Sequence, residues 1–301
     1  MNLVLPIVAF VAAAVNGGLG YGFSSITVPV ALLFQANRVL NPALVLIELF
    51  VNGLALIANR RALPRVLPKM PFLLVGLAPG VVAGSLLLTH VDSGLLKVCT
   101  FSVLLPLILL QSAGVRRPIR HERLAAVPAG ALFGALYGAT TISGPPLALL
   151  FNNQGLQKDD FRAALSVFRV MESLCTLTAY LALGLFDGPV LALAGSLAPS
   201  VIIGLPLGYI ALRKVAPEPF RRVCMAADAL LVAFALARTL ISHNFVAAPV
   251  AWAGLSVVAA LEAAILISFA LRRSVPVDPE EPALPATGGA RRRVALVETV
   301  R

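Results

Sequence analysis

The chain has 301 residues, of which 59% are hydrophobic and 13% are charged, and its mean hydropathy is +0.91. A soluble domain carries about 25% charged residues, so this composition excludes an ordinary globular protein and predicts one embedded in a membrane. The 24 Lys and Arg against 14 Asp and Glu give a net charge of +10. These basic residues lie in short connections and in the C-terminal tail, which is typical of membrane orientation and not of a nucleic-acid-binding face.

Apolar segments follow one another along most of the chain. About 20 apolar residues cross the hydrocarbon core of a bilayer. On this criterion the segments fall near residues 3–34, 41–59, 70–89, 94–112, 124–152, 162–184, 189–212, 219–241 and 247–271. Seven of them have the length of one crossing. The segments 3–34 and 124–152 are too long for one crossing and too short for two crossings with a loop.

These two long segments contain the same glycine-rich and hydroxyl-rich motif. Gly18, Tyr21, Gly22, Ile26 and Pro29 match Gly134, Tyr137, Gly138, Ile142 and Pro145, while Ser24, Ser25 and Thr27 match Thr140, Thr141 and Ser143. Irregular backbone inside hydrocarbon survives only where protein covers it or where it lines a cavity. The repeat therefore predicts a shared site between two halves of a membrane protein.

The basic connections predict the orientation of the segments. They contain Arg60, Arg61, Arg65 and Lys69; Arg116, Arg117, Arg120 and Arg123; Arg213, Lys214, Arg221 and Arg222; and Arg272 and Arg273. The positive-inside rule places all four in the cytoplasm, which requires an even number of crossings between the second and the third. We therefore expect 124–152 to be a re-entrant hairpin, and 3–34 likewise, with the N-terminus outside and the C-terminus in the cytoplasm. The alternative is that both segments cross once as kinked helices.

The predicted fold class is all-α. We expect a polytopic membrane protein with two inverted repeats, each containing a glycine-broken segment, re-entrant or kinked, and three transmembrane helices. The domains are a first repeat at 1–112, a basic cytoplasmic connection at 113–123, a second repeat at 124–241, an additional helix at 242–271 and a disordered cytoplasmic tail at 272–301.

The motif residues supply what a small anion needs. Glycines let the backbone turn and let a ligand approach N–H groups, and a helix that begins after a break presents N–H donors and a partial positive charge. The candidate substrate-binding residues are Gly20, Gly22, Ser24, Ser25 and Thr27 in the first copy, and Gly138, Thr140, Thr141 and Ser143 in the second. The alternative is that these small residues only allow close helix packing.

Two glutamates form a second matched pair, because Glu48 and Glu172 each lie in the segment after a motif. Carboxylates inside a membrane are costly and usually functional. Arg169 precedes Glu172 by one helical turn, so these two are expected either to form an ion pair or to serve separately, with Glu172 as a proton carrier and Arg169 facing the anion. Glu48 has no basic neighbour in sequence and is the better candidate for proton coupling, with Asn52 as its expected local contact.

The glycine-rich opening, the Ser24-Ser25-Ile26-Thr27-Val28-Pro29 run, the glutamate in the next helix and their recurrence in the second half resemble the sulfite exporter TauE/SafE family of permeases. The resemblance covers about residues 5–245. It implies an inner-membrane permease of two related halves that moves sulfite, sulfoacetate, other organosulfur compounds or small organic anions. Tyr21 interrupts the three-glycine run that is common in this family.

The functional expectation is a secondary transporter for a small anion, such as a sulfur oxyanion, an organosulfonate or a small organic acid. A passive anion channel and a non-transporting membrane scaffold are the alternatives. The chain lacks HExxH, CxxC, GxSxG and P-loop patterns, so we expect no enzymatic activity, no cofactor and no bound metal. The expected partners are the small anionic substrate and membrane lipid, without nucleic acid, and assembly into a homo-oligomer is left open.

Overall fold

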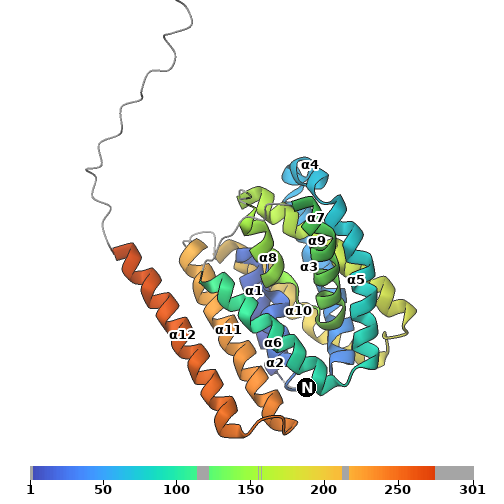
Figure 1. The fold of residues 1–301 in the computed structure, drawn as a ribbon. Helices are drawn as coiled ribbons and strands as arrows, with labels where there is room; N and C mark the ends of the chain where they lie inside the picture. Colours follow the sequence, from blue (N-terminus) through green and yellow to red (C-terminus); the bar gives the residue numbers. More distant parts are fainter. Residues whose placement is uncertain (1–2, 114–121, 155, 157, 212–216, 275–301) are drawn as a thin grey trace, which may run out of the picture. The chain divides into compact units, whose positions relative to one another are not determined.

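The computed structural model describes residues 3–113, 122–154, 156, 158–211 and 217–274 (Figure 1). Residues up to Leu266 form one compact unit, and the segment from Ile267 onward is a second unit. All regular secondary structure in the described part is helical, and seven of its helices are long and apolar enough to cross a membrane. The prediction of a polytopic all-α membrane protein is confirmed.

The seven long helices match the predicted single crossings closely. They are α3 (Asn37–Ala58), α5 (Pro71–His90), α6 (Ser93–Ser112), α9 (Lys158–Ala182), α10 (Gly188–Ala211), α11 (Pro217–Ser242) and α12 (Ala248–Ser274). A helical connection joins α3 to α5 through η1 (Arg60–Ala62), α4 (Leu63–Val66) and η2 (Leu67–Lys69). Most of the predicted basic connection at 113–123 and of the predicted tail at 272–301 lies outside the described residues.

Each of the two long segments is broken at its motif, as the repeat predicts. The first forms α1 (Val4–Leu19) and α2 (Phe23–Ala31), and the second forms α7 (Glu122–Thr140) and α8 (Gly144–Asn153). Gly20 and Gly22 adopt φ of 85° and 108° at the first break, a region that glycine enters without steric cost. Thr141 holds φ of 57° at the second break. A β-branched residue in this region is strained.

The α7–α8 pair begins and ends at the end of the unit that carries the 60–69 connection. The α7 helix runs parallel to α5, because Gly130 packs against Leu73 and Gly134 against Leu77. The α9 helix starts shortly after α8 ends, and its Asp160 pairs with Arg65 of the 60–69 connection at 2.7 Å. The α8 helix therefore returns to the end from which α7 starts.

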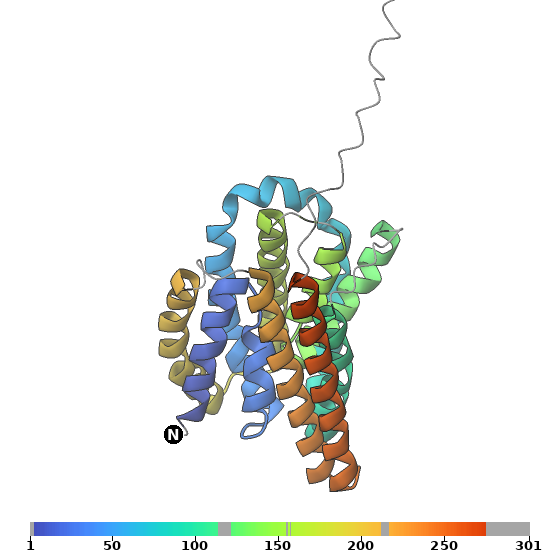
Figure 2. The ribbon, with the colours of Figure 1, turned by 90° about the vertical axis from the view of Figure 1, so that its left-hand side faces the viewer.

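The α1–α2 pair begins and ends at the opposite end. The α1 helix runs parallel to α10, with the Gly208 backbone against Ala14. The chain leaves α2 beside the start of α6, where Lys97 Nζ donates to Leu32 O at 2.7 Å. Figure 2 shows the chain start and the 60–69 connection at opposite ends of this unit. Both broken segments thus fold back on themselves, which agrees with the hairpin topology and not with single kinked crossings. The inverted-repeat relationship stays a prediction.

Packing partners are exchanged between the two halves. In the first half α1 packs along α10 of the second, and in the second half α7 packs along α5 of the first. The central α3 and α9 pack on each other, as do α6 and α11. Backbone contact at glycines makes the outer pairs tight, since a Cβ on Gly80 would overlap the Ala131 carbonyl. These pairs enclose the motif breaks and the faces of α3 and α9 that meet them.

Candidate functional site

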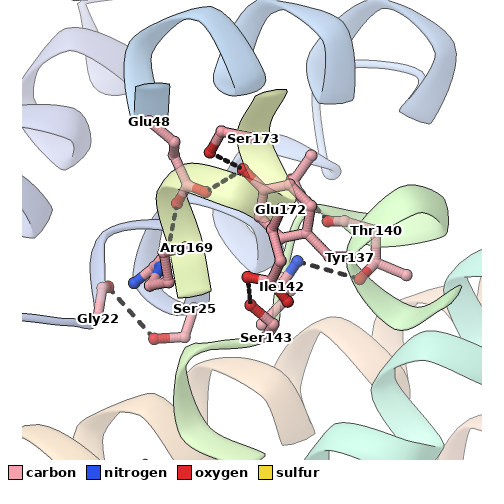
Figure 3. Close-up of polar contacts among 11 residues, drawn as sticks. Gly22, Ser25, Glu48, Tyr137, Thr140, Ile142, Ser143, Arg169, Glu172 and Ser173 are labelled. Carbon is pink, nitrogen blue, oxygen red and sulfur yellow. Dashed lines mark hydrogen bonds and ion pairs between the residues drawn. The ribbon is translucent and has the colours of Figure 1, made fainter. Parts of the chain in front are cut away.

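The centre of the site is a buried ion pair between the two halves. Arg169 Nη2 of α9 lies 2.8 Å from Glu48 Oε1 of α3, and both side chains are 1% exposed (Figure 3). Two charges removed from water at this depth cost several kcal/mol each, and only their mutual attraction and further hydrogen bonds offset that cost. Removing one partner alone would leave a buried charge uncompensated.

Tyr137 joins the second motif to this ion pair. Its hydroxyl donates to Glu48 Oε2 at 2.7 Å and lies 2.9 Å from Ser173 Oγ. Tyr137 is fully buried near the end of α7. The matching residue of the first motif, Tyr21, is also buried and lies 3.5 Å from Gln111 Nε2 through its hydroxyl. The hydroxyl of Tyr137 thus bonds the central carboxylate, and the hydroxyl of Tyr21 accepts from Gln111 of α6.

Arg169 retains unused hydrogen-bonding capacity on the side that faces the motifs. Its Nη1 and Nε atoms are buried and have no hydrogen-bond partner among the described residues. A Cβ placed on Gly144 would lie 3.4 Å from Arg169 Nη1 and 3.9 Å from the backbone N of Gly22. The guanidinium group therefore lies where α2 and α8 both begin. Two predicted motif copies far apart in sequence meet at this point.

The starts of α2 and α8 present different donors to this region. No side chain caps either helix start. The first intrahelical acceptor of α2 is Gly22 O, which bonds Ile26 N, so the N–H groups from Phe23 to Ser25 precede the helical ladder. In α8 the first turn contains Pro145 and Pro146, which have no N–H. Most backbone donors at the site therefore come from α2.

Glu172 lies beside the second motif without an ion-pair partner. Ser143 Oγ donates to Glu172 Oε2 at 2.6 Å, whereas Glu172 Oε1 is buried without a hydrogen-bond partner in the described part of the chain. Of the two alternatives left open for Arg169 and Glu172, the ion pair is not found, since Arg169 bonds Glu48. The expected contact of Glu48 with Asn52 is wrong, because Asn52 Nδ2 has no partner. The partners of Glu48 and Arg169 depend on which way each side chain points across the interface between α3 and α9. The spacing of residues in the sequence does not show this direction.

Asp228 of α11 occupies the matching place beside the first motif. It is 7% exposed, and Ser25 of α2 is one of its neighbours. The Ser25 hydroxyl itself donates to Gly22 O at 3.2 Å. Asp228 lies within the predicted segment 219–241, but it was not among the predicted site residues. Its signal was an isolated carboxylate in an apolar helix.

The remaining predicted residues divide into two groups. Ser24 and Thr27 are buried in α2, and Thr27 Oγ1 has no hydrogen-bond partner within the described ranges. Thr140 and Thr141 donate to the nearby carbonyls of Leu136 and Thr140, at 2.6 and 2.7 Å. Their hydroxyl protons are therefore directed into the backbone of the break. We had expected them to point toward a ligand.

Gly138 has a packing role that the sequence did not distinguish from ligand binding. A Cβ at Gly138 would lie 2.6 Å from the Val81 carbonyl of α5. Its own carbonyl accepts from Tyr180 Oη at 2.7 Å. Gly20, in contrast, lies at the end of α1, where the break requires a positive φ.

The ends of the broken helices are satisfied by side chains from the central pair. Arg162 Nη2 of α9 donates to Gly18 O at 2.7 Å, and Asn41 Nδ2 of α3 donates to Ala139 O at 2.7 Å. Carbonyl groups at a helix C-terminus otherwise remain unpaired, which is expensive away from water. The α3 and α9 helices thus stabilise both breaks as well as carrying the ion pair.

A helical membrane protein with two opposed broken segments around buried charged residues has the construction of a membrane transporter. The chain belongs to the sulfite exporter TauE/SafE family, whose family model matches residues 5–236. This is a family of membrane transporters, which agrees with the expectation that the chain is not an enzyme. The match ends within α11, before α12 begins. No curated protein and no solved structure gives a significant match.

Proposed function

We propose that the protein is a secondary transporter for a small anion, namely a sulfur oxyanion, an organosulfonate or a small organic acid. It works in the bacterial inner membrane, with the N-terminus outside and the C-terminus in the cytoplasm. The anion binds between the starts of α2 and α8, where Arg169 supplies positive charge. Transport follows from rocking of the two halves around this point.

The observation that carries the proposal is the orientation of Arg169. A guanidinium group that is 1% exposed and uses only one of its three nitrogens is unusual, because buried donors are normally paired. An oxyanion is the natural partner for a guanidinium group. The partial positive charge of the start of α2 adds to this attraction.

The hydroxyl groups at the start of α2 support the same location for the anion. Ser24, Ser25 and Thr27 are all buried in the first two turns of α2, directly after Gly22. Hydroxyl groups can hold an oxyanion without a full countercharge, as backbone N–H groups do. Such a site favours sulfite, sulfonates and carboxylates, which share small size and oxygen acceptors.

The test uses purified protein in proteoliposomes, with efflux of sulfite and of methanesulfonate as the measurement. The variant is the double substitution Glu48→Gln and Arg169→Gln, since the single Arg169 substitution would leave Glu48 as an unpaired buried charge. We expect the double variant to insert in the membrane normally and to lose at least tenfold of the transport rate. A tenfold loss corresponds to about 1.4 kcal/mol of anion-binding free energy.

The matched control is Arg65→Gln, which removes an exposed arginine that pairs with Asp160 beside the connection from α3 to α5. We expect this variant to keep most of the transport. Undiminished efflux in the double variant would contradict the proposed site. Efflux that lacks saturation and trans-stimulation would show a passive channel in place of a carrier.

A further inference from the structure

Two buried carboxylates at the site have no ion-pair partner among the described residues. The buried Arg, Asp and Glu side chains around the breaks are Glu48, Arg169, Glu172 and Asp228, and the partly buried Arg162 donates to Gly18 O at the first break. The ion pair of Glu48 with Arg169 is neutral overall. Glu172 and Asp228 would add two negative charges if both were ionised. An anion would then enter a site with a net charge of the same sign.

Arg169 is the one cation that acts on Glu172 among the described residues. The groups that face it are Arg169 on its own helix, Glu48 on α3 and Tyr137 on α7. Cys175 lies one turn later on α9, and from α8 the contact is the neutral hydroxyl of Ser143. Arg169 already bonds Glu48, so it does not neutralise both carboxylates.

The surroundings of Asp228 are similar. Cys224 lies one turn earlier on α11, and Ser25 is the contact from α2. Lys97 is the single charged residue in α1, α2 and α6 as described, and its ammonium group donates to Leu32 O at the far end of α2. Glu262 of α12 is bonded by Ser112 Oγ at 2.7 Å. Asp228 therefore has no countercharge among these neighbours.

The two carboxylates lie beside different motifs. Ser143 of the second motif donates to Glu172 at 2.6 Å, and Ser25 of the first motif is a neighbour of Asp228 (Figure 3 shows the bond of Ser143 to Glu172). Glu172 Oε1 and Asp228 Oδ1 are both buried and unpaired within the described ranges. An ionised carboxylate that is buried and unpaired is costly in free energy.

We infer that Glu172 and Asp228 each bind a proton when the anion is bound, so that anion and protons are carried together. This inference rests on the proposed anion site. Each step is the addition of a water-derived H⁺ to a carboxylate, which gives a neutral carboxylic acid. The neutral acids leave Arg169 and the α2 start as the charges that the anion meets. By linkage, protonation strengthens anion binding and anion binding strengthens protonation by the same factor.

The test is isothermal titration calorimetry of the full chain in detergent with sulfate and methanesulfonate, whose charges stay fixed over the pH range used. Titration in two buffers of different ionisation enthalpy gives the number of protons taken up per anion. We expect protons to be taken up when the anion binds. The affinity for the anion should then fall about tenfold for each unit of pH increase and for each linked proton.

The variants are Glu172→Gln, Asp228→Asn and their combination, which imitate the protonated side chains. Each single variant should bind the anion with one linked proton fewer, and the double variant should bind it independently of pH. The matched control is Glu262→Gln, a buried carboxylate that also accepts from a serine hydroxyl, in this case Ser112, which belongs to neither motif. It should keep the pH dependence of the unchanged protein.

The outcomes separate this inference from the proposed function. Anion binding without proton uptake, or with a dependence on sodium in place of pH, would overturn the coupling and leave the anion site standing. Unchanged proton uptake in the double variant would also overturn the inference. Absence of binding of either anion at every pH would overturn the anion site and the coupling together.

Discussion

At the scale of single residues, the ion pair of Glu48 with Arg169 and the hydroxyl of Tyr137 define the centre of the protein. All three side chains are fully buried and come from three different helices. Tyr137 donates to an ionised group, whereas the other buried tyrosine near it, Tyr180, donates to the neutral backbone carbonyl of Gly138. Hydrogen bonds to charged groups contribute more to stability than bonds between neutral groups.

This difference predicts the order of two matched substitutions. Tyr137→Phe should lower the free energy of unfolding by about 1.5–3 kcal/mol and Tyr180→Phe by about 0.5–1.5 kcal/mol, because each removes one hydroxyl group from a buried ring. Unfolding of the purified variants in a denaturing detergent measures both values. An equal or larger loss in Tyr180→Phe would mean that the Glu48 carboxylate does not depend on Tyr137.

At this scale the sequence identified charged residues that the structure buries, but not their partners. Glu48, Arg169 and Glu172 were predicted as site residues because charged side chains in apolar helices are costly in free energy and are usually functional. The assigned partners were wrong because spacing of three or four residues describes contacts on one helix only. Glu48 and Arg169 are separated by 121 positions, and the face on which α3 meets α9 is set by packing. Asp228 was left out of the site for the same reason.

At the scale of helices, glycine has two separate uses. Gly20 and Gly22 supply the positive φ of the α1–α2 break, whereas Gly80 lies within α5 and lets its backbone contact α7. The sequence does not separate these uses, because a partner helix is not visible in it. Gly138 was predicted at the ligand site, and the structure shows that it also packs closely against Val81 of α5. The positions of both breaks, in contrast, were correctly predicted from the repeat.

Gly80→Ala and Gly195→Ala form a matched pair for this distinction. A Cβ at Gly80 would overlap the Ala131 carbonyl, while Gly195 in α10 has no neighbour within 4 Å of the added atom. We expect Gly80→Ala to destabilise the protein by about 1–3 kcal/mol through overpacking. Gly195→Ala should leave stability unchanged or raise it by up to about 1 kcal/mol through helix propensity. Thermal unfolding monitored by aggregation compares the two, and equal midpoints would contradict the close α5–α7 contact.

At the scale of the whole molecule, the composition alone predicted the class of fold, and basic connections predicted its topology. The broken segments fold back at opposite ends of the unit, as the even number of crossings required. Hydropathy and charge act over whole segments and are visible in one sequence. The meeting of the two motifs at Arg169 depends on packing between the halves, and the repeat only suggested it.

The orientation in the membrane is testable by cysteine labelling in intact cells, in a background where Cys99, Cys175 and Cys224 are replaced. A cysteine at Arg61, in the connection between α3 and α5, should react with a membrane-impermeant maleimide only after the cells are opened. A cysteine at Asp187, between α9 and α10, should react in intact cells. The reverse pattern would place the basic connections outside and contradict the proposed orientation.

The central claim is that an anion binds to Arg169 where α2 and α8 begin. An experimental structure of the protein with selenate bound, located by the anomalous scattering of selenium, tests it most directly. The account predicts selenium density beside Arg169 Nη1, next to the backbone of Gly22 and Gly144. Selenate bound elsewhere, with this position unoccupied at saturating concentration, would contradict the account.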